Sequence, residues 1–594
     1  MSRREDVLNL YNFLLGRDPE NDTAIMPRLN RKMSEVFSEI VRSEEFSFRL
    51  VRPAIDGVAT SQYQGSVPLF DLVAWANKEL PLDVRTRELL DEANSWDDVS
   101  RALLRDTAVI RLNPELQRPA VRRSVERNIL AAEGGVSIEK FFVSPDGQCF
   151  LSGSLTSLQA ADIRNISINR AGALIGTTGK IGRCLRVKKG ELPDPHRGLA
   201  GFWAIFSLKE PVEAGVKLEV VLAADKERCC PVVTVVVSDM RLRDLSLEHL
   251  ADARFYGEPT AEAFFQLDGG VGQSFIDYNY KVVARILDGA YRMRFGTRRV
   301  SYDGTIIVCL YGKPDYLMLQ AALFSECPGY DGYEFIYVSN SPELCERLAS
   351  DAAIASRIYG LAITLIMLPG NAGFGAANNA AAAVAETDRL LFVNPDVLPR
   401  DAEWPRRHAE LVRDLPPRQI KFFGATLYYD DGSLMHGGMY FDVDYGFTIR
   451  SGNLLRRDAM RVEHYGKGAP SELMSYHRAR QVPAVTGAFM SVDRRWFEKL
   501  GGFSRKYIFG HYEDADLCLR SLESGTPTWI HDLPFWHLES KGSAQTPAII
   551  GGRLVNRWFF TSTWHEFVKK EFGERHPKNE RNSSSRDRSK LSSV

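Results

Sequence analysis

The second half of the chain alternates short apolar runs with helical patterns, and this alternation constrains its fold more than any other feature. Strands that are apolar on both faces and alternate with helices are typical of a parallel α/β sheet. Ligands of such sheets bind beyond the carboxyl ends of the strands. We therefore expect a Rossmann-like mixed sheet whose functional residues follow its strands. The apolar runs lie at 305–310, 335–338, 363–368 and 390–393, and the helical patterns at 315–324, 342–358 and 376–385.

Composition limits the function classes that fit this chain. A formal net charge of −1 gives no overall field for nucleic acid, so no nucleic-acid partner is expected. No run of apolar residues is long enough to predict a transmembrane helix, and no apolar stretch follows Arg3 and Arg4 as in a secretory signal. The eight cysteines include no CxxC pair, which indicates reduced thiols. We expect a cytoplasmic protein, and the basic tail leaves open a weak peripheral contact with the inner face of a membrane.

The chain of 594 residues is too long for one ordinary domain. Residues 1–130 form helical modules, because apolar residues recur at helix spacing over residues 7–14, and Ser34 is a candidate cap for the second helix. Short β-prone runs separated by turn residues predict a β-sandwich over residues 131–240, either a binding unit or a spacer. The remaining ranges are a connecting helical segment at 241–300, the α/β domain at 301–572 and a disordered tail at 573–594.

Three segments carry side chains suited to chemistry. Asp396 follows the fourth apolar run, which places its carboxylate at the carboxyl end of a strand. Glu513, Asp514 and Asp516 lie within four residues, and such dense like charges need a cation, a substrate or a basic side chain to balance them. His537 lies in an aromatic segment. Each feature alone also has a structural interpretation, as a turn residue, an acidic helix start or a buried histidine.

In this order, the segments resemble glycosyltransferase family 2, and especially its rhamnosyltransferase-like members. The resemblance covers residues 301–572 and implies a GT-A fold there. Residues 14–20 resemble a small helical module that is appended to bacterial proteins. The matching elements are the first strand with Tyr311, the asparagine- and glycine-rich loop 371–379, Asn394-Pro395-Asp396, the segment 485–490, Gly501-Gly502-Phe503, the acidic segment 513–520 and His537.

The resemblance implies a role for each matching residue. Asp396 and His537 are the expected ligands of a divalent cation, and Asp514 is the expected catalytic base, with Glu513 as second choice. The expected donor-binding residues are Tyr311, Ser339, Asn371, Gly373, Asn378 and Asn394, and the expected acceptor-side residues are Gly487, Ala488, Gly501, Gly502, Phe503 and His436.

These residue types suit transfer of a sugar from a nucleoside-diphosphate donor to a glycan or a lipid-linked glycan. A cation on the diphosphate stabilises the charge that the leaving group gains, and hard oxygen ligands favour Mg²⁺ or Mn²⁺. The acceptor hydroxyl needs a general base, and neighbouring carboxylates raise the pKa of Asp514 toward a useful range. One base opposite the leaving group gives in-line displacement, so the anomeric configuration inverts. The resemblance and the appended modules indicate synthesis of a surface polysaccharide.

The sequence departs from the family pattern at three positions. The second strand ends in Ser339-Asn340 where an aspartate that helps to hold the nucleobase is usual, Asn394 replaces the first aspartate of the metal motif, and Ser504 stands where aspartate is common. A second hypothesis therefore stays open, a binding or scaffolding protein built on a degenerate transferase domain. The loop at 371–379 keeps the alternative of a close-packed helix start, and His436 that of a hairpin turn. Rhamnose follows from the family branch alone.

Overall fold

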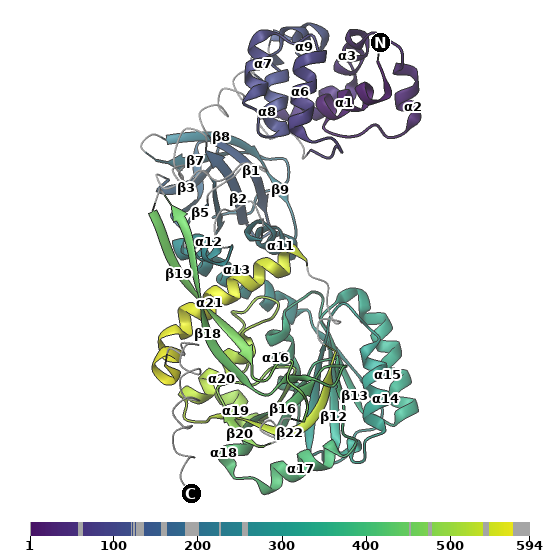
Figure 1. Ribbon diagram of the computed structural model, residues 1–594, viewed down its shortest axis with the longest axis vertical. Coiled ribbons are helices and arrows are strands. Elements are labelled where there is room, and N and C mark those ends of the chain that lie inside the picture. Colours follow the sequence, from purple (N-terminus) through teal and green to yellow (C-terminus); the bar gives the residue numbers. More distant parts are fainter. Residues whose placement is uncertain are drawn as a thin grey trace, which may run out of the picture.

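The structure is a computed structural model, and it shows a chain built from several packed regions (Figure 1). It describes residues 2–56, 63–119, 121–122, 125, 136–155, 163–184, 201–224, 227–251, 259–450, 453–472, 478–538 and 546–573. The predicted disordered tail lies outside these residues, apart from Gly573.

The first region consists of short helices around a core of their own (Figure 1). Its first helix ends at Gly16, whose φ of 68° is the left-handed cap conformation that glycine favours. The helix predicted to follow begins at Met33 behind Lys32, so Ser34 lies within the first turn and does not cap it. The helices are α1 (Arg4–Leu15), α2 (Asp22–Ile25), α3 (Met33–Val41), α4 (Glu44–Phe46), α5 (Arg52–Asp56), α6 (Leu69–Glu79), α7 (Val84–Asp91), α8 (Trp96–Leu103) and α9 (Thr107–Leu112).

Two sheets with a shared apolar core form the second region, as expected of a sandwich. Their strand orders are β5-β6-β2-β1-β9 and β4-β3-β7-β8. Strand β1 has no counterpart among the predicted strands, because a bulge between Ile138 and Lys140 interrupts its alternation. The strands are β1 (Val136–Val143), β2 (Gln148–Leu155), β3 (Asn165–Arg170), β4 (Ala173–Thr178), β5 (Gly182–Cys184), β6 (Gly201–Ser207), β7 (Lys217–Ala223), β8 (Glu227–Val233) and β9 (Val235–Val236).

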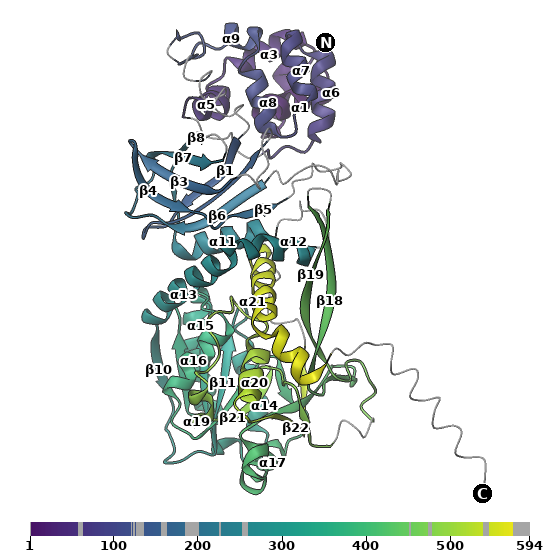
Figure 2. The ribbon, with the colours of Figure 1, turned by 90° about the vertical axis from the view of Figure 1, so that its left-hand side faces the viewer.

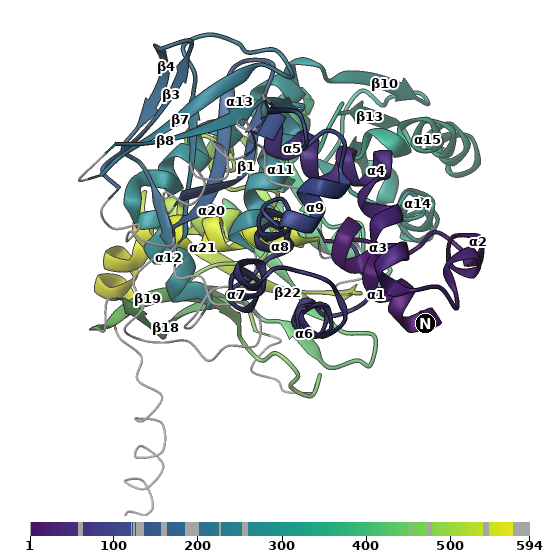
Figure 3. The same cartoon turned by 90° about the horizontal axis from the view of Figure 1, so that it is seen from above.

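Three helices join the sandwich to the C-terminal domain, namely α11 (Asp239–Leu250), α12 (Pro259–Gln266) and α13 (Gly272–Asp288) (Figure 2). Trp203 of β6 donates its indole N–H to Gln266 at 2.8 Å, and both side chains are buried. The connecting segment is not helical throughout, since Tyr291–Phe295 forms strand β10. This strand pairs antiparallel with β13 and so joins the C-terminal sheet at its edge (Figure 3).

The C-terminal domain contains a mixed sheet of eleven strands, which confirms the expected α/β architecture. Its path runs β10-β13-β12-β11-β14-β21-β16-β22-β15, with β17 beside β16 and β20 beside β22. The four strands from β13 to β14 are parallel to one another. The bounds are β11 (Gly304–Leu310), β12 (Tyr333–Ser339), β13 (Ile363–Met367), β14 (Arg389–Val393), β15 (Val397–Pro399), β16 (Phe422–Tyr428), β17 (Leu434–His436), β20 (Arg480–Val482), β21 (Phe489–Asp493) and β22 (Thr528–His537).

Helices cover both faces of this sheet. Successive residues of each strand point to opposite sides, so strands that are apolar throughout need a packed layer on each face. Ile306 and Val308 of β11 lie in one core and Ile307 in the other. The first core includes residues of α14 (Tyr316–Ser325), α15 (Cys345–Tyr359) and α17 (Trp404–Asp414). The second includes residues of α16 (Phe374–Val384), α19 (Arg494–Lys499), α20 (Glu513–Glu523) and the long α21 (Pro547–Phe572).

A long hairpin, β18 (Met439–Arg450) and β19 (Asn453–His464), extends beside α21 toward the sandwich (Figure 2). Thr561 of α21 accepts a hydrogen bond from the backbone N–H of Met460 on β19 at 3.0 Å. In the described parts of the chain, none of the helices combines the length and apolar character needed to cross a membrane.

Candidate active site

Strand pairing brings Asp396 and His537 together. Asp396 lies in the turn between β14 and β15, and β15 pairs antiparallel with the end of β22, so that Val397 lies opposite His537. His537 Nε2 is consequently 3.4 Å from Asp396 Oδ1, and both side chains are buried. The backbone N–H of Leu538 also donates to the carbonyl of Asp396 at 3.0 Å.

The geometry of this pair fits a divalent cation. Two ligands at about 2.1 Å from one ion lie roughly 3 Å apart when they are near a right angle. His537 Nδ1 lies 3.5 Å from the Met435 sulfur, so Nε2 is the ring nitrogen that faces the carboxylate. No group of three or more such side chains is gathered for a metal within the described residues. A cation held by this pair would therefore take its other ligands from phosphate or water oxygens.

Asp514 lies in the first turn of α20, where two backbone N–H groups hold its carboxylate. Gly487 donates to Oδ2 at 2.9 Å and Ala515 donates to Oδ1 at 2.8 Å. Burial raises the pKa of Asp514, although these hydrogen bonds act in the opposite direction. The side chain remains partly accessible, so it combines a raised pKa with exposure to solvent.

The neighbouring carboxylates of Asp514 have other surroundings. Glu513 is 5% exposed, and its Oε2 has no hydrogen-bond partner in the described structure. Burial first, and then the charge of Asp514, raise the pKa of Glu513 well above its ordinary value. Asp516 is also buried, and it accepts hydrogen bonds from Arg520 at 2.8 Å and from Trp564 at 2.9 Å. The raised pKa of Glu513 therefore favours its uncharged form, and the hydrogen bonds of Asp516 indicate a structural role.

The short segment 486–488, which leads into β21, lies between the turn that contains Asp396 and the carboxylate of Asp514. Ala488 accepts a hydrogen bond from the backbone N–H of Asn394 at 2.8 Å, while Gly487 donates to Asp514. A Cβ on Gly487 would lie 3.1 Å from the ring of Phe374 and 3.4 Å from the Cβ of Asp514, so this position favours glycine. The structure thus joins the predicted metal ligands and the predicted base through adjacent residues.

Asparagine side chains fix the loop that begins α16. Asn371 Oδ1 accepts from the side chain of Asn340 and from the backbone N–H of Gly373, both at 2.9 Å. Asn340 Oδ1 accepts in turn from the N–H of Ala372 at 2.9 Å. Gly373 has a φ of 87°, and a Cβ there would come within 3.0 Å of the backbone of Phe509. Asn340, which the sequence showed only as a missing aspartate, is thus an anchor of this loop.

The other predicted donor-side residues differ in how far their side chains are exposed to solvent. Ser339 is fully buried and donates to the carbonyl of Ser341 at 3.0 Å. Asn378 is buried and donates to the carbonyl of Phe374 within its own helix at 2.9 Å. Tyr311 directly follows β11 and is half-buried. Of these three side chains, that of Tyr311 is the one accessible at the carboxyl edge of the sheet.

The predicted acceptor-side residues do not gather at one place. Gly487 and Ala488 are next to Asp514, whereas Gly501, Gly502 and Phe503 line an open pocket of about 740 Å³ that includes none of the predicted catalytic residues or metal ligands. Arg520 donates to the carbonyl of Gly502 at 2.8 Å, which indicates a structural role for that turn.

His436 lies in the interior beneath the site. Its Nδ1 is 2.8 Å from Nδ1 of His464, and the side chain is fully buried at the end of β17. Burial, followed by the neighbouring His464, lowers the pKa of His436 well below its ordinary value. A neutral, paired His436 contributes to the base of the hairpin rather than to an exposed sugar contact.

Arg243 of α11 contacts the site, although no sequence motif marked it. Its side chain is 2% exposed and donates to the carbonyl of Asn371 at 3.0 Å. The guanidinium also lies 4.4 Å from the ring centroid of Phe509. Arg243 precedes Asn371 by 128 residues, so only the folded chain reveals the contact.

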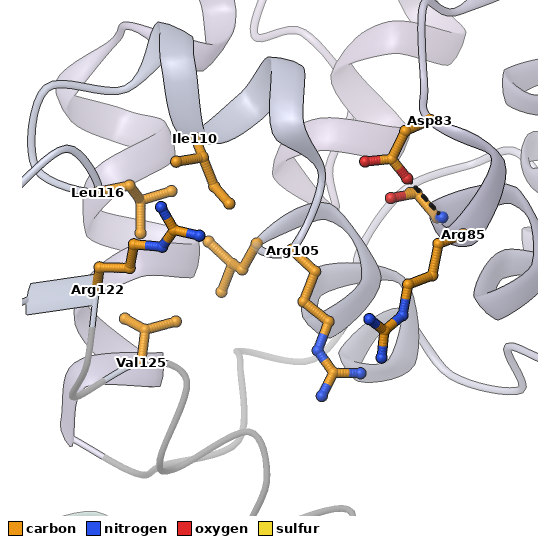
Figure 4. A pocket seen from close by; sticks show the side chains of 9 residues that line it. Asp83, Arg85, Arg105, Ile110, Leu116, Arg122 and Val125 are labelled. Atoms are coloured by element: carbon orange, nitrogen blue, oxygen red, sulfur yellow. Dashed lines mark hydrogen bonds between the residues drawn. The ribbon is translucent and has the colours of Figure 1, made fainter.

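A further pocket, of about 270 Å³, lies in the helical region (Figure 4). Arg85, Arg105 and Arg122 line it together with Asp83, whose carboxylate accepts from the backbone N–H groups of Thr86 and Thr107. None of the predicted site residues lies in this pocket.

Comparison with known proteins gives partial matches. No protein-family model matches the chain. The uncharacterized protein y4gI of Sinorhizobium fredii is 27% identical over 221 residues, which are 37% of this chain and 23% of that protein. The O-antigen biosynthesis protein RfbC of Myxococcus xanthus is 27% identical over 235 residues, which are 39% of this chain and 16% of that protein. The chain thus spans less than a quarter of the length of these two relatives.

Solved structures of two glycosyltransferases show a limited likeness to the chain. GalNAc-T7 with UDP, GalNAc and Mn²⁺ has a TM-score of 0.32 and 13% identity, and the match covers 45% of this chain and 49% of that one. The mannosyltransferase PcManGT from Pyrobaculum calidifontis, in complex with GDP-Man and Mn²⁺, has a TM-score of 0.28 and 15% identity, with 55% and 85% covered. These scores are too low to assign a fold or an activity to this chain. The functional inference therefore rests on the chain's own residues.

Proposed function

We propose that this chain is an inverting glycosyltransferase of the family 2 type. It moves a sugar from a nucleoside-diphosphate donor to a glycan or a lipid-linked glycan. Asp396 and His537 bind the divalent cation, Mg²⁺ or Mn²⁺, and Asp514 is the catalytic base. The relative named for O-antigen biosynthesis supports a product that is part of a surface polysaccharide. Rhamnose is the candidate sugar, from the resemblance to the rhamnosyltransferase-like branch.

One observation carries the proposal. Ala488 in the segment 486–488 accepts from the N–H of Asn394, two residues before Asp396, and Gly487 in the same segment donates to the carboxylate of Asp514. A cation at the first position and a base at the second can therefore act on one substrate. A bound cation would neutralise the charge that develops on the leaving diphosphate.

The protein's own groups supply the remaining steps. Asp514 accepts the proton of the acceptor hydroxyl, and its raised pKa makes it a stronger base than an ordinary aspartate. The N–H groups of Gly487 and Ala515 fix the direction of its carboxylate. The loop held by Asn340 and Asn371 leads into α16, and the N-terminus of a helix favours the anionic oxygens of a donor.

The test is transfer and donor hydrolysis by the purified protein with UDP-, GDP- and dTDP-sugars in the presence of Mn²⁺. We expect Asp514→Asn to lower turnover by about 10²- to 10⁴-fold, because the acceptor loses its general base. The same variant should keep the rise in Tm that donor and Mn²⁺ cause, since binding to the native state is retained. His537→Ala should lose the part of that rise that depends on Mn²⁺.

The matched control is Asp414→Asn, at an exposed ion pair with Arg413 on α17. It should leave turnover unchanged. Near-normal turnover of Asp514→Asn would refute the base assignment. A protein that no nucleotide sugar stabilises, with or without Mn²⁺, would refute the transferase and favour a binding protein.

A further inference from the structure

The loop that leads into α20 has an unusual backbone. Phe509, His511 and Tyr512 take φ values of 60°, 81° and 75°, a left-handed region that residues with a side chain rarely adopt. Tyr512 directly precedes Glu513 and Asp514 and is the N-cap of their helix. Three such residues in four positions cost free energy, so other groups must hold this conformation in place.

One buried side chain, Asn556 of α21, makes hydrogen bonds along this loop. Its Oδ1 accepts from the N–H of Ile508 at 2.7 Å. Its Nδ2 lies within hydrogen-bond distance of three carbonyls, those of Ile508 at 2.9 Å, Gly510 at 2.7 Å and His511 at 3.3 Å. Asn556 is 0% exposed and lies in the interior of a helix of 26 residues. The amide thus satisfies backbone groups that the left-handed turns leave without regular partners.

We propose that Asn556 is a positioning residue, which holds the loop 508–512 and thereby fixes both the catalytic base and the loop 371–379, called the donor loop below. The inference rests on the proposed function and deepens it, because it assigns to the C-terminal helix a part in catalysis. Asn556 touches no reacting atom and acts through the loop.

The loop contacts both sides of the site. On the base side, Tyr512 accepts a hydrogen bond from the N–H of Asp516 at 2.9 Å, which begins the helix that carries Asp514. On the donor side, the carbonyl of Phe509 accepts from the N–H of Phe374 at the start of α16. A shift of this loop would consequently move Asp514 and the donor loop together.

Close packing makes α21 a rigid support for Asn556. Gly551 leaves no room for a Cβ, which would lie 2.1 Å from the carbonyl oxygen of Leu247 on α11. A Cβ on Gly552 would lie 3.2 Å from the ring of Phe509. Arg553 donates to Nε2 of His511 at 2.7 Å. Three of six successive residues of α21 therefore contact the loop.

The test replaces the amide donors with the smallest change of shape. Asn556→Asp keeps an acceptor for Ile508, but even when it is protonated it has a single O–H for the three carbonyls. We expect its kcat to fall by about 10- to 100-fold, as for a small misplacement of catalytic groups. We also expect the acid limb of its pH–kcat profile to move to lower pH, because a released loop lets water reach Asp514 and removes the burial that raises its pKa.

Thr561→Val is the matched control on the same helix. It also removes a buried hydrogen-bonding group, but that group bonds Met460 of the hairpin and not the loop. We expect a lower Tm with kcat and the acid limb unchanged. A purely structural Asn556 would behave like Thr561, with a lower Tm and an unshifted pH profile, and that result would overturn the proposal.

A second pair of variants keeps the test available if Asn556→Asp does not fold. His511→Gly lowers the cost of the left-handed turn, so Asn556→Ala in that background needs less support from α21. We expect the double variant to have a lower kcat and a shifted acid limb relative to His511→Gly alone, whereas a kcat within twofold would overturn the proposal.

If Asp514→Asn is also fully active, the proposed function itself has failed. If Asp514→Asn is inactive and the variants at Asn556 are normal, only the positioning role has failed.

Discussion

Adjacent carboxylates in this protein differ because of burial and not because of their type. Asp514 is partly accessible and receives two backbone N–H bonds, whereas Glu513 is buried with an unpartnered oxygen. A buried carboxyl without donors is more stable protonated than charged. We infer that Glu513 stays neutral while Asp514 ionises, which separates two residues that the sequence presents as equals.

This difference gives a prediction for Glu513→Gln, since glutamine resembles the neutral acid. We expect kcat within a few-fold of the original protein, in contrast to the loss for Asp514→Asn. The raised pKa of Glu513 also means that the folded state keeps a proton that the unfolded state releases. Stability is therefore fully present below the ordinary pKa and falls as pH rises toward the raised one.

Glu513→Gln removes that loss, so its Tm relative to the original protein should rise as the pH increases above the ordinary pKa of a glutamate. Thermal unfolding at several pH values measures the difference. Glu571→Gln, at an exposed position of α21, is the control and should show a difference that changes little with pH. A constant difference for Glu513→Gln would show that this carboxyl is already charged in the folded protein.

At the scale of elements, the packed helices α11 and α21 support the two loops of the candidate site. Both helices contribute to the core that also includes the inner residues of α16 and α20. Arg243 of α11 contacts the loop 371–379 and Asn556 of α21 contacts the loop 508–512. The two loops are thus held by helices that lie outside the parallel strands.

Gly551→Ala tests this packing, because the added Cβ would lie 2.1 Å from a backbone oxygen of α11 that cannot move as a side chain can. We expect destabilisation of about 1–3 kcal/mol from the forced separation of the helices. Denaturant unfolding gives the free energy of unfolding. Thr563→Ala, at an exposed position of α21, should change stability little, and an equally stable Gly551→Ala would show that the crossing is loose.

At the scale of the whole molecule, the packed cores define units of unfolding. The sandwich residues Phe150 and Trp203 belong to the same core as α11, α13 and the C-terminal sheet. The helical region has a separate core, and Lys217 of the sandwich pairs with Asp56 of this region at 3.5 Å. We therefore expect two unfolding transitions, one for the helical region and one for the remainder.

Calorimetry of single variants assigns these transitions. Phe37→Ala in the helical core should lower the Tm of one transition, and Phe392→Ala in the C-terminal core should lower the Tm of the other. Each variant should lose about 3–5 kcal/mol of unfolding free energy in its own region. Donor with Mn²⁺ should raise only the transition that Phe392→Ala lowers. A single transition moved by both variants would show that the regions unfold together.

The sequence by itself determined the elements whose signals are local. The apolar runs after residue 304 lie within β11, β12, β13 and β14 to within one or two residues, because a strand buried on both faces must be apolar throughout. The positions of Asp396 and Asp514, after a strand and at a helix start, also follow from local pattern. Strand β10 and the long hairpin have no such apolar run, since polar residues interrupt their apolar ones.

Only the tertiary structure decided which residues meet at the site. The contact between His537 and Asp396 depends on the register of β15 against β22, and the separate fates of Glu513 and Asp514 depend on burial. Asn340, Arg243 and Asn556 reach the loops from distant parts of the chain. Their contacts cross long sequence separations, and such contacts follow from packing and register, which no window of sequence contains.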